Sequence, residues 1–373
     1  MMKKNVIIIM IDGGRLDYAL KSSYFNKLKS RAVFFSQSIT YAPHTIAAMH
    51  AVFSGCYGNR TGTNSYWSTY KFRKLKFKTI TEYLHENGYH TECDIINELI
   101  LPRQGFDEFQ IHDELKDDLL LRHSKLVRKM VDVSKEKNFF LYLHYSKIHT
   151  TIRDQVLKPY TNYSKDYFEK KEENQKRYNR LFNDAEIYLD NILQEITNFG
   201  FDKNSLILVM SDHGVSTGEK FGERAYGAFC YDYTLRTFTY FMSSDFSPIH
   251  LNQQVRTIDL MPTILDYLEI SLDENYEQID GISLIPMING QKQLEEIAYS
   301  ETGNPLEKDR PPKEPNTRSV RTSKWKLIHK DYDNSKELYN LECDPNEENN
   351  IIGKGEKMEK FLSEKLEELE NRD

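Results

Sequence analysis

The segment NVIIIMIDGG, residues 5–14, decides the fold that this sequence predicts. Residues 6–11 are all apolar and mostly β-branched, as in a central strand buried on both faces of a parallel sheet. Asp12 ends this run, and two glycines then break it. A carboxylate at the end of a buried strand must be paired or must bind a cation, because burying it alone is costly. The alternative is a structural role for Asp12 as the N-cap of a helix.

The chain then alternates between strand and helix patterns. A helical pattern over residues 79–87 stops at Gly88 and is followed by a strand, and residues 140–145 and 206–210 form further core strands. Apolar residues at helical spacing predict a long helix near residues 178–199. This order predicts an α/β fold with a doubly wound, mostly parallel sheet flanked by helices, whose ligands gather at the carboxyl ends of the strands.

Two segments depart from this alternation. Residues 151–180 are polar and charged without clean periodicity, which indicates an insertion or a lid near the site. After about residue 290, short antiparallel strands and a charged amphipathic helix over residues 354–370 are expected. We therefore predict a catalytic α/β domain over residues 1–290 and a smaller C-terminal subdomain over residues 291–373.

The composition excludes several classes of protein. With 50 basic and 57 acidic residues the net charge is −7, which argues against a nucleic-acid partner bound through bulk charge. The four cysteines form no CxxC pair, so neither a zinc knuckle nor a disulfide framework is expected. The N-terminal apolar run is short and ends in an acid, unlike a signal peptide, and no stretch approaches the roughly 20 apolar residues of a membrane helix. We expect a soluble, cytoplasmic protein with no membrane span, while its oligomeric state stays open.

The tetrapeptide SDHG at residues 211–214 follows the predicted strand over residues 206–210. Asp212 and His213 place a carboxylate and an imidazole side by side at a strand end, where both can face one divalent cation. Gly214 lets the backbone turn closely around such an ion. The alternative interpretation is an ordinary turn.

The segment APHTIAAMH, residues 42–50, places the hydroxyl group of Thr45 at the start of a predicted helix. Thr45 opens an apolar helix, where the backbone amides and the helix dipole can stabilise an alkoxide and the anion that it attacks. An N-cap role is the alternative and is common for threonine. Together with Asp12 and the pair Asp212–His213, however, Thr45 predicts a metal-activated nucleophile for transfer or hydrolysis of a phosphoryl-type group.

These residues together resemble the alkaline phosphatase and sulfatase superfamily, and the resemblance covers nearly the whole chain. Further matches are Ser54–Gly55, ten residues beyond Thr45, the segments at 79–91 and 256–268, and two segments close to C-terminal sulfatase motifs at 280–284 and 337–350. The resemblance implies one cation held by Asp12, Thr45, Asp212 and His213. It also implies that His149, an isolated histidine beyond the strand at 140–145, protonates the leaving oxygen or binds a non-bridging oxygen; a structural histidine is the alternative.

The sequence departs from the sulfatase pattern at the nucleophile. Sulfatases carry Cys-x-Pro-Ser-Arg, or serine in place of cysteine, and convert the first residue to formylglycine, whereas this chain has Thr45-Ile-Ala-Ala-Met. Threonine nucleophiles in the superfamily belong to phosphodiesterases and phosphotransferases. We therefore favour a metal-dependent hydrolase or transferase of phosphate esters that works through a phosphothreonine, with a glycan or cell-envelope precursor as one substrate class by analogy. The alternatives are a sulfatase that lacks formylglycine and a non-catalytic protein that binds anions or glycans.

Two further expectations come from the resemblance. No Asp-x-x-x-His group accompanies His149, so a single cation is expected, with manganese, magnesium, calcium and zinc all open. Asn64, Lys220 and Arg224 are candidates for binding the substrate's oxyanion. Asn64 is equally a turn residue, and the segment that carries Lys220 and Arg224 is equally a solvated charged loop.

Overall fold

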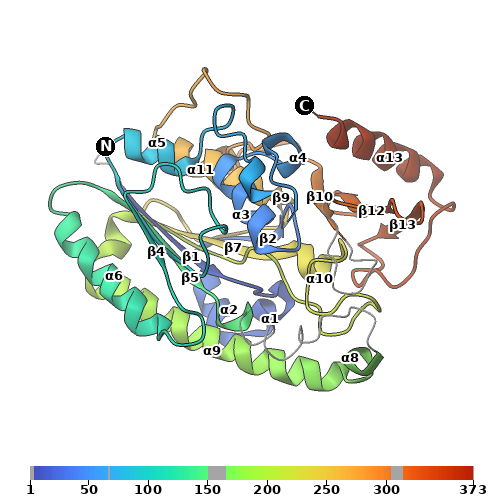
Figure 1. Ribbon diagram of the computed structural model, residues 1–373, viewed down its shortest axis with the longest axis horizontal. Coiled ribbons are helices and arrows are strands. Elements are labelled where there is room, and N and C mark those ends of the chain that lie inside the picture. The colour runs from blue at the N-terminus through green and yellow to red at the C-terminus, as the bar shows by residue number, and fades with distance from the viewer. Residues whose placement is uncertain (1–3, 66–67, 150–164, 304–313, 373) are drawn as a thin grey trace.

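The computed structural model describes residues 4–65, 68–149, 165–303 and 314–372. Its centre is a nine-stranded sheet in the order β4-β3-β5-β1-β6-β7-β2-β8, with β9 paired to β2 (Figure 1). The strands are β1 Asn5–Ile11, β2 Val33–Ile39, β3 His90–Ile95, β4 Glu108–Ile111, β5 Phe139–Tyr145, β6 Ser205–Met210, β7 Arg236–Met242, β8 Ile249–Leu251 and β9 Val255–Arg256. β1 lies between β5 and β6 and is parallel to both, whereas β7 is antiparallel to its two neighbours.

The side chains of β1 alternate between two cores, one on each face of the sheet. Ile7, Ile9 and Ile11 pack with residues of α9, while Val6 and Ile8 pack with residues of α3 and α11. Each fully buried aliphatic side chain stabilises the fold by roughly 1.5–3 kcal/mol, so both faces fix this strand. The predicted central strand, buried on both faces, is therefore confirmed.

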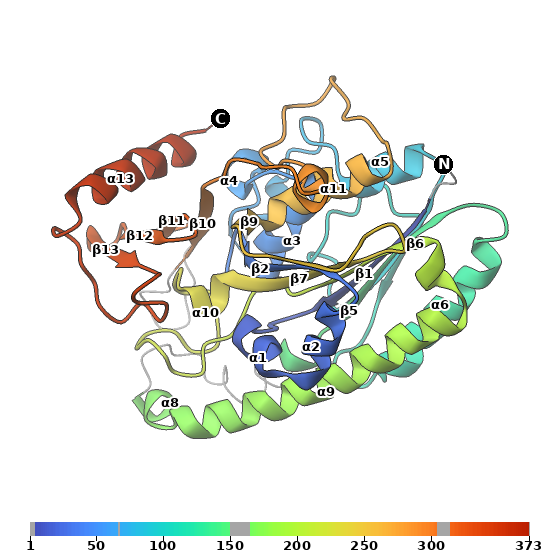
Figure 2. The same cartoon turned by 180° about the vertical axis from the view of Figure 1, so that it is seen from behind.

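Helices cover both faces of the sheet (Figures 1 and 2). On one face lie α1 Leu16–Lys21, α2 Ser23–Lys29, α6 Leu119–Val133 and α9 Lys171–Asn198; on the other lie α3 Thr45–Ser54, α5 Ile80–Glu86 and α11 Leu260–Tyr267. The shorter helices are α4 Gly58–Thr61, η1 Thr69–Lys71, α8 Lys165–Glu169, η2 Phe201–Lys203, α10 Asp232–Leu235, η3 Thr257–Asp259 and α12 Ile285–Ile288. The predicted fold class, a mostly parallel sheet flanked by helices, is confirmed.

The long helix begins earlier than the apolar pattern indicates. α9 starts at Lys171 rather than near residue 178, because its first two turns are charged and mostly solvated and show no apolar spacing. Asn174 fixes this end of the helix, since its amide donates to the carbonyl oxygens of Tyr167 and Thr217 at 2.8 and 3.3 Å. Of the predicted insertion at 151–180, residues 151–164 lie outside the described residues. In the part of the chain that the structure describes, no helix is long and apolar enough to cross a membrane.

A four-stranded antiparallel sheet and a terminal helix follow, as predicted. The strands are β10 Ala298–Thr302, β11 Thr317–Arg321, β12 Trp325–Lys330 and β13 Ser335–Asn340, in that order, and α13 spans Glu356–Glu370. Leu362, Leu366 and Leu369 of α13 pack on this sheet, and the same core includes Ala47 and Ala51 of α3. The C-terminal layer therefore packs against the helix that Thr45 begins. A boundary between two domains near residue 290 stays a prediction.

Candidate active site

Four of the predicted residues lie together at the carboxyl edge of the central sheet. Asp12 follows β1, Asp212 and His213 follow β6, and Thr45 is the first residue of α3. The hydroxyl oxygen of Thr45 lies 3.4 Å from Asp12 Oδ2 and 3.2 Å from His213 Nε2. His213 Nε2 lies 3.4 Å from Asp212 Oδ2 and 3.7 Å from Asp12 Oδ1. All four side chains are buried, so these atoms face one another in a small polar centre.

Thr45 owes its place to the way α3 begins. The N-cap is His44, which has an extended backbone, so Thr45 is the first helical residue and does not cap the helix. Its hydroxyl is therefore turned to Asp12 and His213 rather than to the amides of its own helix. α3 is buried along its whole length, which fixes the position of the hydroxyl. The positive end of the helix dipole adds a field that favours an anion at this point.

The donor set fits a divalent cation. Gly214 O accepts a hydrogen bond from Nδ1 of His213 at 2.8 Å, which leaves the lone pair of a neutral His213 on Nε2, facing the carboxylates. Asp12 Oδ1 and Asp212 Oδ2 are buried and have no hydrogen-bond partner among the described residues. Lone pairs turned toward one another repel unless a positive charge lies between them. Two carboxylates, an imidazole and a hydroxyl are ligands that manganese, magnesium or zinc accept.

Backbone amides hold the second carboxylate in place. Asp212 Oδ1 accepts hydrogen bonds from the backbone N–H groups of Gly13 and His213 at 3.1 and 2.9 Å. Gly13 has a φ of 71°, and a Cβ there would lie 2.9 Å from the Val215 side chain, so only glycine fits this turn. Burial raises the pKa of Asp212, and the neighbouring Asp12 carboxylate also acts to raise it.

His144 belongs to this site and is absent from the predicted residues. It lies on β5 opposite Met10, and its Nε2 is 3.0 Å from Asp12 Oδ2. Burial acts to raise the pKa of Asp12, but the charge of His149 and the hydrogen bond and charge of His144 outweigh it and lower that pKa to about 2. The signal in the sequence is an imidazole inside the aromatic strand FFLYLHY, next to the central strand of a parallel sheet.

His149 lies in the same cavity as Asp12 and Thr45. This cavity has a volume of about 350 Å³, with an apolar wall that includes Ile46 and Ile100 and a polar wall that includes His112 and Glu114. The Nδ1 atom of His149 is 3.5 Å from Glu114 Oε2. Burial acts to lower the pKa of His149, but the charges of Asp12 and Glu114 outweigh burial and raise it. The raised pKa shifts the imidazole of His149, which lines the same cavity as Thr45, toward its protonated form.

The structure does not bring the three predicted oxyanion-binding residues to this cavity. Asn64 follows α4, and its backbone N–H donates to Ser68 Oγ at 2.9 Å. Lys220 donates to the carbonyl oxygen of Glu347 and lies over the ring of Tyr231, beside a separate cavity of about 380 Å³. Arg224 is buried with its guanidinium 5.5 Å from the ring centroid of Tyr167. Their substrate-binding roles stay predictions.

Glu223, a buried residue of the segment that follows His213, makes the stability of the protein depend on pH. Its carboxylate accepts hydrogen bonds from the backbone N–H groups of Ala228 and Phe229 and from Tyr233 Oη. Burial outweighs these bonds and raises the pKa of Glu223 from 4.5 to about 7. The folded state therefore binds this proton more tightly than the unfolded state, and its stabilisation is complete below pH 4.5 and is lost as the pH rises through 7.

We expect the free energy of unfolding to fall by on the order of 3 kcal/mol through Glu223 between pH 4.5 and pH 8. The variant Glu223→Gln cannot ionise and should lose this part of the fall. Urea unfolding of both proteins at several pH values measures the difference. Parallel pH profiles for the two proteins would contradict the assignment.

A hydroxyl between carboxylates and an imidazole, at the carboxyl edge of a doubly wound sheet, is the arrangement that the predicted alkaline phosphatase and sulfatase superfamily requires. Residues 4–270 match the model of the sulfatase family, and residues 229–372 match the C-terminal model of N-sulphoglucosamine sulphohydrolase. The chain belongs to the sulfatase family. The superfamily resemblance is confirmed.

Two curated proteins are similar to part of the chain. Choline-sulfatase from Rhizobium meliloti is 29% identical over 195 residues, which cover 49% of this chain and 35% of that protein. Delta 4,5-hexuronate-2-O-sulfatase from Bacteroides thetaiotaomicron is 29% identical over 182 residues, which cover 47% and 36% of the two chains. The matched part thus spans about a third of the length of these relatives.

Solved structures share the fold over nearly the whole chain. A protein solved with its substrate D-glucosamine-2-N,6-O-disulfate has a TM-score of 0.77 at 18% identity, over 98% of this chain and 97% of that one. Phosphonate monoester hydrolase from Agrobacterium radiobacter has a TM-score of 0.76 at 15% identity, over 98% and 95% of the two chains. Taken together, the comparisons support the sulfatase alternative better than the favoured prediction of a phosphate ester hydrolase.

Proposed function

We propose that this chain is a metal-dependent hydrolase of sulfuric esters in which the hydroxyl of Thr45 attacks the sulfur atom. The observation that carries the proposal is the position of that hydroxyl, 3.2 Å from His213 Nε2 and 3.4 Å from Asp12 Oδ2 at the N-terminus of α3. Membership of the sulfatase family and the similarity to two named sulfatases support a sulfuric rather than a phosphoric ester.

The residues of the site divide the reaction between them. Asp12, Asp212 and His213 would hold a divalent cation beside Thr45; when bound, it lowers the pKa of a hydroxyl group and neutralises charge on an oxyanion. The Thr45 hydroxyl gives up its proton to water, and its oxygen forms a bond to sulfur while the bond from sulfur to the leaving oxygen breaks. His149 gives a proton to that leaving oxygen. Water then cleaves the sulfate ester of Thr45 and restores the free hydroxyl.

Hydrolysis of phosphoric esters is the second candidate, and the identity of residue 45 favours it. Formylglycine cannot arise from threonine by the route that sulfatases use, whereas a threonine oxygen can attack phosphorus through the same steps and give a phosphothreonine. Transfer to an acceptor alcohol instead of water would follow the same course. The cavity of about 350 Å³ is near the lower end of the range for ligand sites, which fits a small alcohol or a single sugar unit as the leaving group.

Paired ester assays test this proposal. We would measure kcat/KM for 4-nitrophenyl sulfate, 4-nitrophenyl phosphate and bis(4-nitrophenyl) phosphate, each with manganese, magnesium, calcium and zinc. The highest value with the sulfate ester supports the proposal, and the highest value with either phosphate ester favours the second candidate. Cation binding without turnover of any ester would instead support the non-catalytic alternative.

The proposed role of His149 as a general acid can be tested by comparing esters with good and poor leaving groups. A general acid is needed for a poor leaving group but not for 4-nitrophenolate, which leaves readily without a proton. We expect His149→Gln to lower kcat for an alkyl ester of the preferred acid by about 100-fold, and to change kcat for the 4-nitrophenyl ester much less. Equal losses on both esters would show that His149 binds a non-bridging oxygen instead.

A further inference from the structure

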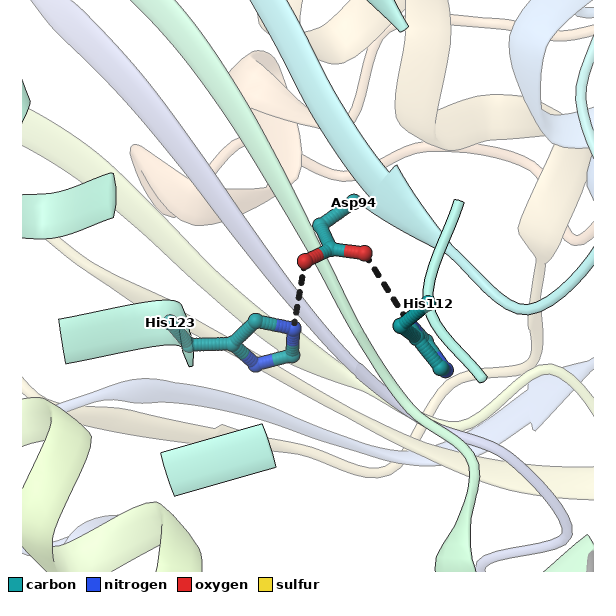
Figure 3. A group of neighbouring side chains, drawn as sticks. All are labelled: Asp94, His112 and His123. Atoms are coloured by element: carbon teal, nitrogen blue, oxygen red, sulfur yellow. Dashed lines mark hydrogen bonds and ion pairs between the residues drawn. The ribbon is translucent and has the colours of Figure 1, made fainter. Parts of the chain in front are cut away.

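A second cluster of ionisable side chains lies behind the wall of the active-site cavity. It consists of Asp94 on β3, His112 just after β4 and His123 on α6, all of them buried. Figure 3 shows both imidazoles facing the carboxylate of Asp94 from different elements. His112 Nδ1 is 2.9 Å from Asp94 Oδ1, and His123 Nε2 is 3.7 Å from Asp94 Oδ2. Sequence analysis did not single out any of these residues.

The outer nitrogen of each imidazole has a partner that orients the ring. His112 Nε2 is 2.9 Å from Ser146 Oγ, and His123 Nδ1 is 2.5 Å from Tyr188 Oη. Metal-binding histidines usually have such an oxygen partner on the nitrogen that does not bind the ion. The inner nitrogen of His123 is buried and has no hydrogen-bond partner among the described residues. A polar atom that is buried without a partner is costly, so this nitrogen indicates a missing ligand.

The charge around the cluster also favours a cation. Burial lowers the pKa of both histidines, which favours the neutral form that binds a metal through a lone pair. Asp94 accepts a hydrogen bond from the partly exposed guanidinium of Arg122, which also lies 3.7 Å from Asp117. The segment that follows His112, residues 113–118, contains four carboxylates and one lysine. Asp117 thus offsets part of the charge that Arg122 brings to Asp94.

We propose that Asp94, His112 and His123 bind a second divalent cation, of the zinc class, which is separate from the one expected at Thr45. Zinc sites with three protein ligands combine imidazole nitrogen with carboxylate oxygen and keep a fourth position open. Tetrahedral ligands about 2.1 Å from zinc lie about 3.4 Å apart. One ligand atom from each of Asp94, His112 and His123 lies within 4.8 Å of the other two, so a small movement would bring all three to one ion.

Such an ion would stabilise one wall of the active site. His112 lines the cavity beside Thr45, and its ring centroid lies 5.9 Å from that of His144, which contacts Asp12. A cation at Asp94 would join the ends of β3 and β4 to α6 behind this wall. The ion is expected to act by positioning, because none of its three ligands contacts Thr45.

Zinc stoichiometry tests the proposal. In Asp212→Asn, where the site at Thr45 is weakened, chelated protein returned to zinc and passed through gel filtration should keep one zinc per chain. Adding His123→Gln should remove that zinc, while adding His85→Gln, which changes an exposed histidine, should not. Diffraction at the zinc absorption edge from zinc-soaked wild-type crystals should place a peak between Asp94, His112 and His123. This peak does not depend on whether any variant folds.

A second test uses Arg122, whose replacement should strengthen zinc binding instead of weakening it. Its guanidinium competes with the cation for Asp94, so Arg122→Gln should tighten zinc binding by on the order of tenfold, whereas Arg128→Gln, an exposed change on the same helix, should not. The absence of a zinc peak in the wild type, unchanged zinc content in the His123→Gln protein or weaker binding in Arg122→Gln would overturn the proposal. These results do not depend on ester hydrolysis, so they are distinct from a failure of the proposed function.

Discussion

Replacing Thr45 by valine is expected to lower kcat for the preferred ester by at least roughly 1,000-fold while the protein stays folded. Valine has nearly the shape of threonine and fits the buried start of α3, but it has no oxygen to attack sulfur or phosphorus. The residual rate would come from the cation site and from binding alone. Steady-state assays with the best ester, together with circular dichroism of both proteins, measure the effect.

The variant Thr45→Ser is the matched control, because it keeps the hydroxyl and loses only a methyl group. We expect it to retain activity within about tenfold of the wild type and, on slow turnover, to carry the covalent sulfate or phosphate on residue 45. Mass spectrometry of acid-quenched protein detects this modification. Full activity of Thr45→Val would place the nucleophile elsewhere and end the proposed mechanism.

Replacing Asp212 by asparagine is expected to weaken cation binding by more than about 100-fold and to abolish activity at micromolar metal. The Oδ1 atom of asparagine can still accept from the backbone N–H groups of Gly13 and His213. The substitution replaces Oδ2 of Asp212 by an NH₂ group. In the wild type this oxygen is buried and has no hydrogen-bond partner among the described residues. The NH₂ group can donate to His213 Nε2, which lies 3.4 Å from Asp212 Oδ2.

This substitution should therefore change stability in opposite directions with and without the cation. In chelator, Asp212→Asn is expected to be more stable than the wild type by about 1–3 kcal/mol, because a buried unpaired charge is gone. With saturating metal the wild type should be the more stable protein, since a bound ligand stabilises the folded state. Thermal unfolding of both proteins in the two conditions measures the reversal. Equal shifts in both conditions would show that Asp212 holds no cation.

Each site residue that could be predicted from the sequence is marked by the residues next to it in the chain. Asp12 and Asp212–His213 follow apolar runs that can only be core strands, and the carboxyl ends of parallel strands meet at one edge of a sheet. Thr45 opens a helix without a polar face. In each case a chemical group interrupts an apolar pattern, so its burial and its place in the sheet follow from a few neighbouring residues.

The site residues that were not predicted come together only through the pairing of strands and the packing of helices. His144 acts on Asp12 because β5 pairs with β1 in the observed register, which the composition of either strand does not determine. Asp94, His112 and His123 meet only through the packing of β3, β4 and α6. Lys220 donates to the carbonyl oxygen of Glu347, 127 residues away in the chain, a contact that the charged loop around Lys220 does not indicate.

The packing of the C-terminal sheet has a consequence for which substitutions α3 can accept. Ala47 and Ala51 of α3 share a core with Val320, Leu327 and Leu362, so residues far away in the chain form one side of the helix that Thr45 begins. Small side chains there leave no room for repacking, and a larger residue at either alanine would push the attacking oxygen out of line. A change at either alanine would therefore have to be matched by changes in the C-terminal sheet and α13.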